Sequence, residues 1–356
     1  MSYETGASSG RGDLLVKWFN FLQANGWTAD VDWVTSTQSP SYGVIKRKVN
    51  SSPEDQNSVN LHCSFVRGGT ETGSSYSVMN MIPMREYTSG SPILESTSGT
   101  QPFDYMSHNY HVLTTFPETT FENYWFFESD YYAHAVVEYK TGFFRHFGMG
   151  QLNKIGKWIG GEYYYGGQWN YNISFIDNPA ASQHSVLLDG ECTNTQTANI
   201  MYGKLMDGQP FPHLQGRNSP DSYWHAMAAN GETGGGIGED GNRSDRGGLY
   251  ANGPRGGMNS QLYWLGQIGF NGYRPMHPIT VFTHFSLGAP DDLNPLGTMP
   301  DVRSISMEGD LSPGDEFTVG ADTWKVFPVV RKRPVKVLDN TEQSLSFGIA
   351  YKKVLV

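Results

Sequence analysis

Apolar side chains near the start of the chain repeat at spacings of three and four residues, which is the period of one helix face. They are Leu14, Leu15, Trp18, Phe19 and Leu22. Asp13 stands where its side chain can cap the first turn, and Gly26 stands where a helix can end. The pattern predicts one helix with a buried apolar face.

After this helix the pattern becomes that of strands, with short apolar or alternating runs separated by Gly, Pro, Asp and Ser. The strongest run is 124–147, which turn residues at 128–130 and 140–142 divide into a three-stranded meander. The other runs are 59–67, 75–85, 110–116, 153–171, 279–286, 301–307, 316–330 and 345–354. The sequence predicts an α+β fold, predominantly β, in which the N-terminal helix is followed by an antiparallel sheet or sandwich with long Gly-rich loops.

The length of 356 residues exceeds the size at which one hydrophobic core usually stops growing. We therefore divide the chain into a helix plus antiparallel β domain at 1–190, a Gly- and Asn-rich loop or insertion region at 191–272, and a C-terminal β region at 273–356 that packs with the first domain. The middle region lacks apolar periodicity. We expect it to be mobile in the isolated subunit and ordered on assembly.

The composition combines few charges, 17%, with many aromatic residues, 13%, and 42 glycines. This combination is typical of protein interfaces, and also of β-rich monomers with many turns. We favour the interface interpretation because Tyr and Trp supply amphipathic contact area. The expected interface residues lie in the aromatic run that starts at position 143. They are Phe143, Phe144, Arg145, Trp158, Tyr163, Tyr164, Tyr165 and Trp169.

The net charge of −10 argues against a direct grip on nucleic acid, which requires clustered Lys and Arg. No run of eighteen apolar residues occurs, and the first residues lack a basic end followed by an apolar stretch. We therefore expect synthesis in the cytoplasm without a membrane anchor. Cys63 and Cys192 fit no metal or disulfide spacing, so we expect both to be reduced and buried.

Possible ligand and metal motifs are weak. Residues 236–241 match the letters of a dinucleotide-binding loop but lack the flanking strand and helix. His108 and His111 have a spacing that suits a metal only on a helix, which Pro102 and the β-like sequence that follows disfavour. We expect no cofactor and no metal site.

Catalytic motifs are weak too. His134 and His146 stand among aromatic strands, where an imidazole usually packs and bonds a carbonyl. The best candidate for paired glycosidase acids is the group of carboxylates near the aromatic run. Its members are Glu118, Glu122, Glu128 and Asp130. No nucleophile, base and orienting group share a known spacing, so we expect no enzymatic activity.

Five segments resemble structural proteins of tailed bacteriophages. They are 12–27 (GDLLVKWFNFLQANGW), 141–158 (TGFFRHFGMGQLNKIGKW), 160–166 (GGEYYYG), 309–328 (GDLSPGDEFTVGADTWKVFP) and 347–353 (FGIAYKK). The resemblance implies a virion structural component of the neck, collar or baseplate, or one similar to a tail terminator. Such a component forms a homo-oligomeric ring and contacts other phage neck, tail or baseplate proteins.

Two other functions remain open at this point. The chain can be a tail-tip or baseplate receptor-binding protein that holds host carbohydrate on its aromatic surface, with weak glycosidase activity from the carboxylates at 118–130. It can also be a free cytoplasmic enzyme, which would require a compact monomer with a deep polar pocket.

Overall fold

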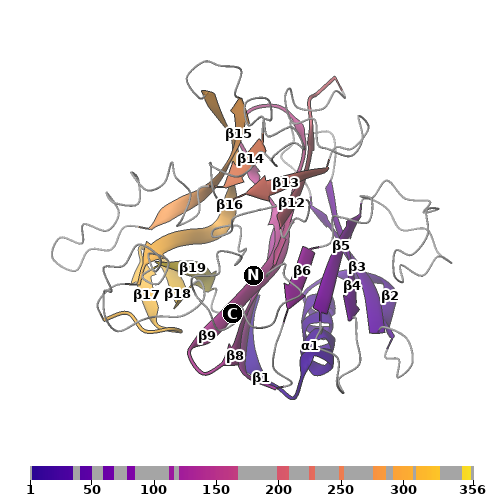
Figure 1. The fold of residues 1–356 in the computed structure, drawn as a ribbon, viewed down its shortest axis with the longest axis vertical. Helices are drawn as coiled ribbons and strands as arrows, with labels where there is room; N and C mark the ends of the chain where they lie inside the picture. Colours follow the sequence, from indigo (N-terminus) through magenta and orange to yellow (C-terminus); the bar gives the residue numbers. More distant parts are fainter. Residues whose placement is uncertain are drawn as a thin grey trace, which may run out of the picture.

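The computed structural model describes residues 2–34, 41–49, 59–67, 78–84, 112–115, 120–166, 199–207, 224–228, 248–251, 276–285, 292–307, 310–328 and 347–353. These residues form one helix and 19 strands, almost all of them antiparallel (Figure 1). The prediction of a predominantly β fold with one N-terminal helix is therefore confirmed, although a strand at Ser2–Ser8 precedes the helix. Most of 191–272 lies outside the described residues.

The helix α1 (Arg11–Ala24) buries the face that the sequence predicts, including Trp18. Its C-terminal end is also as expected, because Gly26 adopts a φ of 88° and the N–H of Trp27 donates to the Leu22 carbonyl. The expected cap at Asp13 is wrong. The helix begins two residues earlier, and the Asp13 carboxylate accepts the N–H of Ser9 from outside the helix.

A small antiparallel sheet follows in chain order. Its strands are β2 (Thr28–Val34), β3 (Ser41–Val49), β4 (Val59–Arg67), β5 (Val78–Met84) and β6 (Val112–Thr115). Ile45 of β3, Leu61 and Cys63 of β4 and Met81 of β5 are buried in one core with the apolar face of α1. Cys63 is thus buried as expected, whereas Cys192 lies outside the described residues.

The second sheet has 14 strands. Its order is β1 (Ser2–Ser8), β7 (Phe121–Ser129), β8 (Tyr132–Lys140), β9 (Phe143–Gln151), β11 (Ile159–Gly166), β12 (Asn199–Lys204), β13 (Trp224–Ala228), β14 (Gly248–Ala251), β15 (His277–Phe285), β16 (Asp292–Ser306), β19 (Phe347–Lys353), β18 (Asp322–Pro328) and β17 (Glu316–Val319), with β10 (Asn153–Lys154) paired to β16. Only the pair β13 and β14 is parallel. The sheet therefore joins early and late parts of the chain.

The predicted three-stranded meander is present as β7, β8 and β9, with tight turns after Ser129 and after Lys140. The single run expected at 316–330 is instead the hairpin of β17 and β18. Gly320 has a φ of 64° there and begins a two-residue turn. The strand expected at 301–307 is the end of β16, which begins at Asp292.

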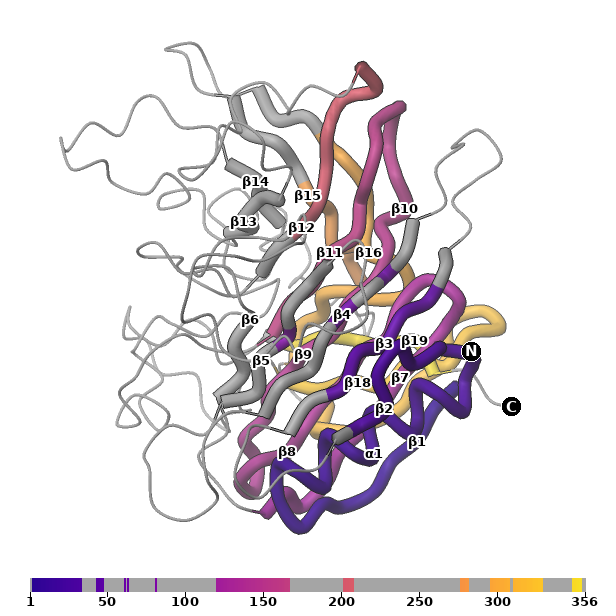
Figure 2. Tube along the Cα trace, turned by 90° about the vertical axis from the view of Figure 1, so that its right-hand side faces the viewer, coloured from indigo at the N-terminus to yellow at the C-terminus, as the bar shows by residue number. Residues whose placement is uncertain are grey.

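The large sheet turns back on itself, so the molecule has three layers (Figure 1). In the middle are β7, β8, β9 and β11. One face of these strands packs on α1 and the small sheet, which lie in front of them in Figure 2. The other face packs on β15, β16, β18 and β19. Both faces of the middle layer are therefore buried within one chain.

The described part of the region 191–272 includes β12, β13 and β14, which continue the large sheet. The late strands belong to the same sheet and pack on β7 and β9 through Phe327 and Tyr351. The division into three regions, and the expected mobility of the middle one, stay predictions.

Candidate functional site

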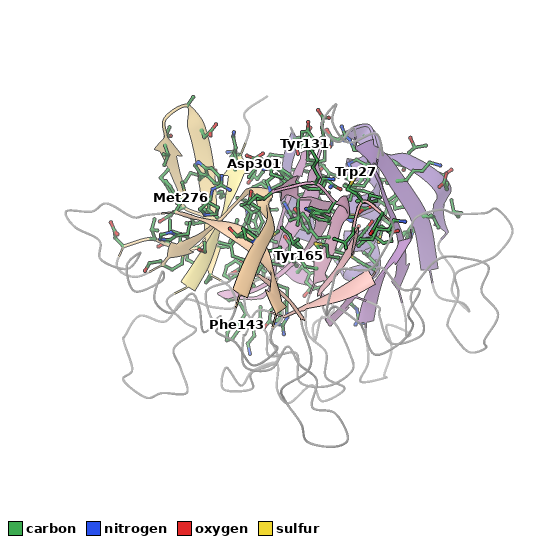
Figure 3. The ribbon with its side chains drawn as sticks, turned by 90° about the horizontal axis from the view of Figure 1, so that it is seen from above. Trp27, Tyr131, Phe143, Tyr165, Met276 and Asp301 are labelled. Atoms are coloured by element: carbon green, nitrogen blue, oxygen red, sulfur yellow. The ribbon has the colours of Figure 1, made fainter. Side chains whose placement is uncertain are left out.

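The residues that the sequence predicts to form an interface lie inside the molecule. Phe144, Arg145, Trp158, Tyr163, Tyr164 and Tyr165 are buried, Phe143 is half-buried, and Trp169 lies outside the described residues. Figure 3 shows Tyr165 in the middle of the molecule, between the late strands and the small sheet. Because an interface anchor must be reachable from outside, this burial gives no support to an interface at these residues.

The three consecutive tyrosines explain why the run is aromatic. Successive side chains of a strand point to opposite faces, so Tyr164 enters the core under α1 while Tyr163 and Tyr165 enter the core under β16 and β19. A strand covered on both faces needs apolar side chains at every position. The run is thus accounted for by the packing of the chain itself.

The candidate glycosidase carboxylates do not act as one group. Glu118 lies outside the described residues, and exposed Glu122 accepts a hydrogen bond of 2.6 Å from the Thr141 hydroxyl. Glu128 is 3% exposed and Asp130 is 82% exposed, yet both pair with the guanidinium of Arg47. Two of the four carboxylates therefore share one cation.

Arg47 ties the small sheet to the large one. Its Nη1 donates to the carbonyl of Asn25 at the end of α1, at 2.7 Å, where the helix dipole favours a cation. The indole of Trp27 donates to the same carboxylate oxygen of Glu128 that pairs with Arg47, at 3.3 Å. Burial raises the pKa of Glu128, and the charge of Arg47 opposes that rise. The cluster fixes the end of the helix against β7.

Two histidines and three tyrosines form a second buried polar group, between the middle layer and the late strands. His134 of β8 is 0% exposed and His146 of β9 is 1% exposed. The phenol oxygens of Tyr165 and Tyr163 lie 2.8 Å and 3.3 Å from Nδ1 and Nε2 of His134. We call these residues, together with Tyr351, the His–Tyr network.

The partners of His146 fix its tautomer. Its Nε2 lies 2.9 Å from the carbonyl oxygen of Pro328, which can only accept, so Nε2 carries the proton. Its Nδ1 is then an acceptor for the hydroxyl of Tyr351 at 2.9 Å. The Tyr351 oxygen lies 3.5 Å from that of Tyr165, which continues the network to His134. The expectation that this strand histidine packs and bonds a carbonyl is confirmed.

Burial governs the protonation of this network. It lowers the pKa of His134 to about 3, with a small further effect of His146. It lowers the pKa of His146 to about 4, against the hydrogen bond to Pro328. The same burial raises the pKa of Tyr165 and Tyr351 well above the ordinary value. Both imidazoles are therefore neutral at pH 7 and the phenols are protonated.

Asp301 lies at one end of the network and is strained. Its φ is 54°. It lies in β16 at an irregularity in the pairing with β15, and the extra residues of β16 at such a bulge change the direction of a side chain. Its carboxylate accepts a hydrogen bond from the hydroxyl of Tyr132, whose ring stacks on His134 at 4.6 Å. Burial and this carboxylate raise the pKa of Tyr132. No local sequence pattern singles out Asp301 or Tyr351, since their partners are distant along the chain.

A third cluster closes the edge of the sandwich. Lys353 of β19 lies 4.8 Å from the ring centre of Tyr3 on β1 and 2.9 Å from Glu316 on β17. Lys325 also bonds Glu316 at 2.9 Å. Partial burial acts to raise the pKa of Glu316, but the two lysines outweigh it and lower the pKa. Burial raises the pKa of Tyr3 to about 12. Lys353 thus links β1 and β17, the two end strands of the large sheet.

Among the described residues, no three His, Cys, Asp or Glu side chains are arranged to hold a metal ion, and no helix is long and apolar enough to span a membrane. His108, His111 and the loop at 236–241 lie outside these residues.

No family model matches the chain, and no curated protein matches it either.

Proposed function

We propose that this chain is a structural subunit that assembles with copies of itself and with neighbouring proteins, in the neck, collar or baseplate of a tailed phage. The virion assignment rests on the resemblance of the five sequence segments to phage structural proteins. The assembly role is supported by the two edge strands of the large sheet.

The observation that carries this proposal is that β1 and β17 are the two end strands of the large sheet. Among the described strands, each of them pairs on one side only. The outer N–H and C=O groups of an edge strand can pair with a strand of another chain. Each of these edges is suited to receive an extended segment of a neighbour.

The hairpin of β17 and β18 shows which groups face outward. With a two-residue turn at Gly320, the flanking pair Val319 and Asp322 exchanges backbone hydrogen bonds, and the next pair, Thr318 and Thr323, does not. The N–H and C=O of Thr318 therefore point away from β18. Val319 is 52% exposed, which leaves an apolar β-branched side chain at the end of this edge.

Polar side chains of the described residues hold the strands of this chain together. The buried carboxylate of Glu128, the buried imidazole of His146 and the exposed carboxylate of Glu316 each bond residues of other strands or of the helix end. Each of them joins elements that are distant in sequence. If the assembly is a closed ring, every interface is heterologous, so the edge at β17 meets a different part of the next copy.

The test is Thr318→Pro, with Thr318→Val as the matched control. Proline removes the outward N–H at a position where an edge strand tolerates it, whereas valine keeps that N–H. We expect self-association, measured by light scattering and native mass spectrometry, to be lost in the proline variant and kept in the valine variant. Equal association of both variants, or a monomer at every concentration of the parent chain, contradicts assembly through this edge.

The virion assignment has its own test. Particles purified from a lysate of cells that produce the chain should contain it at a fixed copy number, measured by quantitative mass spectrometry. Electron microscopy of the same particles should place it in the neck or the baseplate. Absence of the chain from intact particles contradicts the assignment.

A further inference from the structure

The His–Tyr network joins the middle layer to the late layer across a boundary that is largely apolar. Its members come from β8, β9 and β11 of the middle layer and from β19 of the late layer, and His146 also bonds Pro328 of β18. Around it, Phe127, Phe327 and Tyr351 pack ring against ring. The polar contacts across this boundary are therefore enclosed on all sides by the core.

Each imidazole nitrogen in the network has an assigned role at neutral pH. His146 donates to Pro328 and accepts from Tyr351. If Tyr351 donates to His146, its oxygen is left to accept from Tyr165, and the oxygen of Tyr165 can accept from His134. From His134 to Pro328, each group in this series donates to the next one. A second proton on His146 removes the acceptor that Tyr351 needs and places a charge in a dry core.

We propose that the His–Tyr network is an acid-sensitive clasp that holds β18 and β19 on the middle layer at neutral pH and releases them when its imidazoles are protonated. The release is local, because β7, β8 and β9 keep their other face packed on α1 and the small sheet. This inference concerns the subunit alone and does not depend on the phage assignment.

The charged groups around the network favour this behaviour. The guanidinium of Arg145, next to His146 in β9, disfavours a second positive charge there. The Asp301 carboxylate of β16 acts on Tyr132 and Tyr163, and Glu128 of β7 acts on Tyr132. These two carboxylates act on phenols and not directly on His134 or His146, so neither offsets the charge of a protonated imidazole.

The size of the effect follows from proton linkage. The folded pKa values of about 3 and about 4 lie below the ordinary histidine value. The released form therefore binds more protons, and the closed form loses stability as the pH falls below about 6.5. Between pH 7 and pH 5, each histidine raises the population of the released form by roughly 20- to 25-fold. Together the two give a rise of roughly 500-fold.

Amide hydrogen exchange of the full chain at pH 7 and pH 5 tests the proposal, after correction for the intrinsic exchange rate. We expect amides at 324–327 and 349–351 to lose protection at pH 5 while amides at 133–137 keep it. This measurement needs no variant. Equal protection at both pH values, or equal loss in β8 and β19, would overturn the proposal.

His146→Gln is the variant of choice, because a side-chain amide can still donate to the Pro328 carbonyl and cannot take up a proton in this range. We expect its loss of protection between pH 7 and pH 5 to be roughly 20-fold smaller than that of the parent chain. His277→Gln on β15, outside the network, is the matched control and should behave as the parent. An unchanged acid response in His146→Gln would contradict a clasp at this residue.

Discussion

The middle layer and the late hairpin use the same secondary structure in two different surroundings. In β8 every side chain from Tyr132 to Val137 is buried, and in β9 the same holds from Phe144 to Gln151. In β17 only Phe317 is half-buried and its neighbours are exposed. A strand covered on both faces is apolar throughout, whereas a strand covered on one face alternates.

This contrast changes how the high aromatic content of the chain is interpreted. A run of aromatic residues that is apolar at every position fits an inner layer as well as a subunit interface, because both remove side chains from water. The described structure places the run in an inner layer. The exposed edge lies instead at β17, where polar and apolar residues are mixed.

The largest expected effect comes from uncovering the middle layer. Trp18 of α1 packs on Phe126 and Phe147 with ring centres 4.9 Å and 5.4 Å away. We expect Trp18→Ala to lower the free energy of unfolding by about 3–5 kcal/mol, because the cavity left behind cannot close fully. Half-buried Phe317 in the late hairpin is the comparison, and Phe317→Ala should lower it by less than about 2 kcal/mol. Urea denaturation measures both, and equal losses would contradict the contrast.

The parts of the fold that the sequence predicts are those set by neighbours along the chain. The face of α1 and the turns of the meander follow from spacing and turn residues within a few positions. The turn at Gly320 was missed although Gly320 and Asp322 are turn-type residues, because the run at 316–330 was interpreted as one strand. The pairing of Val319 with Asp322 and the φ of 64° at Gly320 show the turn. The His–Tyr network was missed for another reason. His146 and Tyr351 lie 205 residues apart, and no local pattern encodes such a contact.

The second effect compares ion pairs in the two regions. Arg47→Ala leaves the buried carboxylate of Glu128 without its guanidinium, and breaking such a pair costs about 3 kcal/mol. Glu316→Gln, in the partly exposed cluster of the late strands, should cost less than about 1 kcal/mol. Urea melts at pH 7 measure both losses.

The pH dependence of the stability loss caused by Arg47→Ala tests this comparison further. Without Arg47 the pKa of Glu128 in the folded chain rises further above that of the unfolded chain, since burial already raises it. The folded state then binds the extra proton, so the loss caused by Arg47→Ala should shrink as the pH falls from 7 toward 5. A loss that stays constant over this range would show that Glu128 is not the source of the cost.

The third effect compares two glycines. A Cβ on Gly150 in β9 would lie 2.3 Å from the hydroxyl oxygen of Tyr163 and 2.9 Å from Cβ of Tyr132. We expect Gly150→Ala to cost about 1–3 kcal/mol through overpacking. Gly320 has open space around it but a positive φ, so Gly320→Ala should cost about 1 kcal/mol from backbone strain alone. Thermal melts of both variants check the order, and a harmless Gly150→Ala would mean that the middle layer is loosely packed.

The smallest effect on stability is expected at Val319, which is 52% exposed at the end of β17. Val319→Lys should change the free energy of unfolding by less than about 0.5 kcal/mol, because an exposed side chain with no buried partner contributes little to the fold. A lysine on an edge strand also discourages strand addition. Self-association measured by light scattering should therefore fall although urea melts stay unchanged. Val319→Thr keeps the shape without the charge and serves as the control. A clear drop in the free energy of unfolding of monomeric Val319→Lys would show that other parts of the chain cover this edge, as they cover the middle layer.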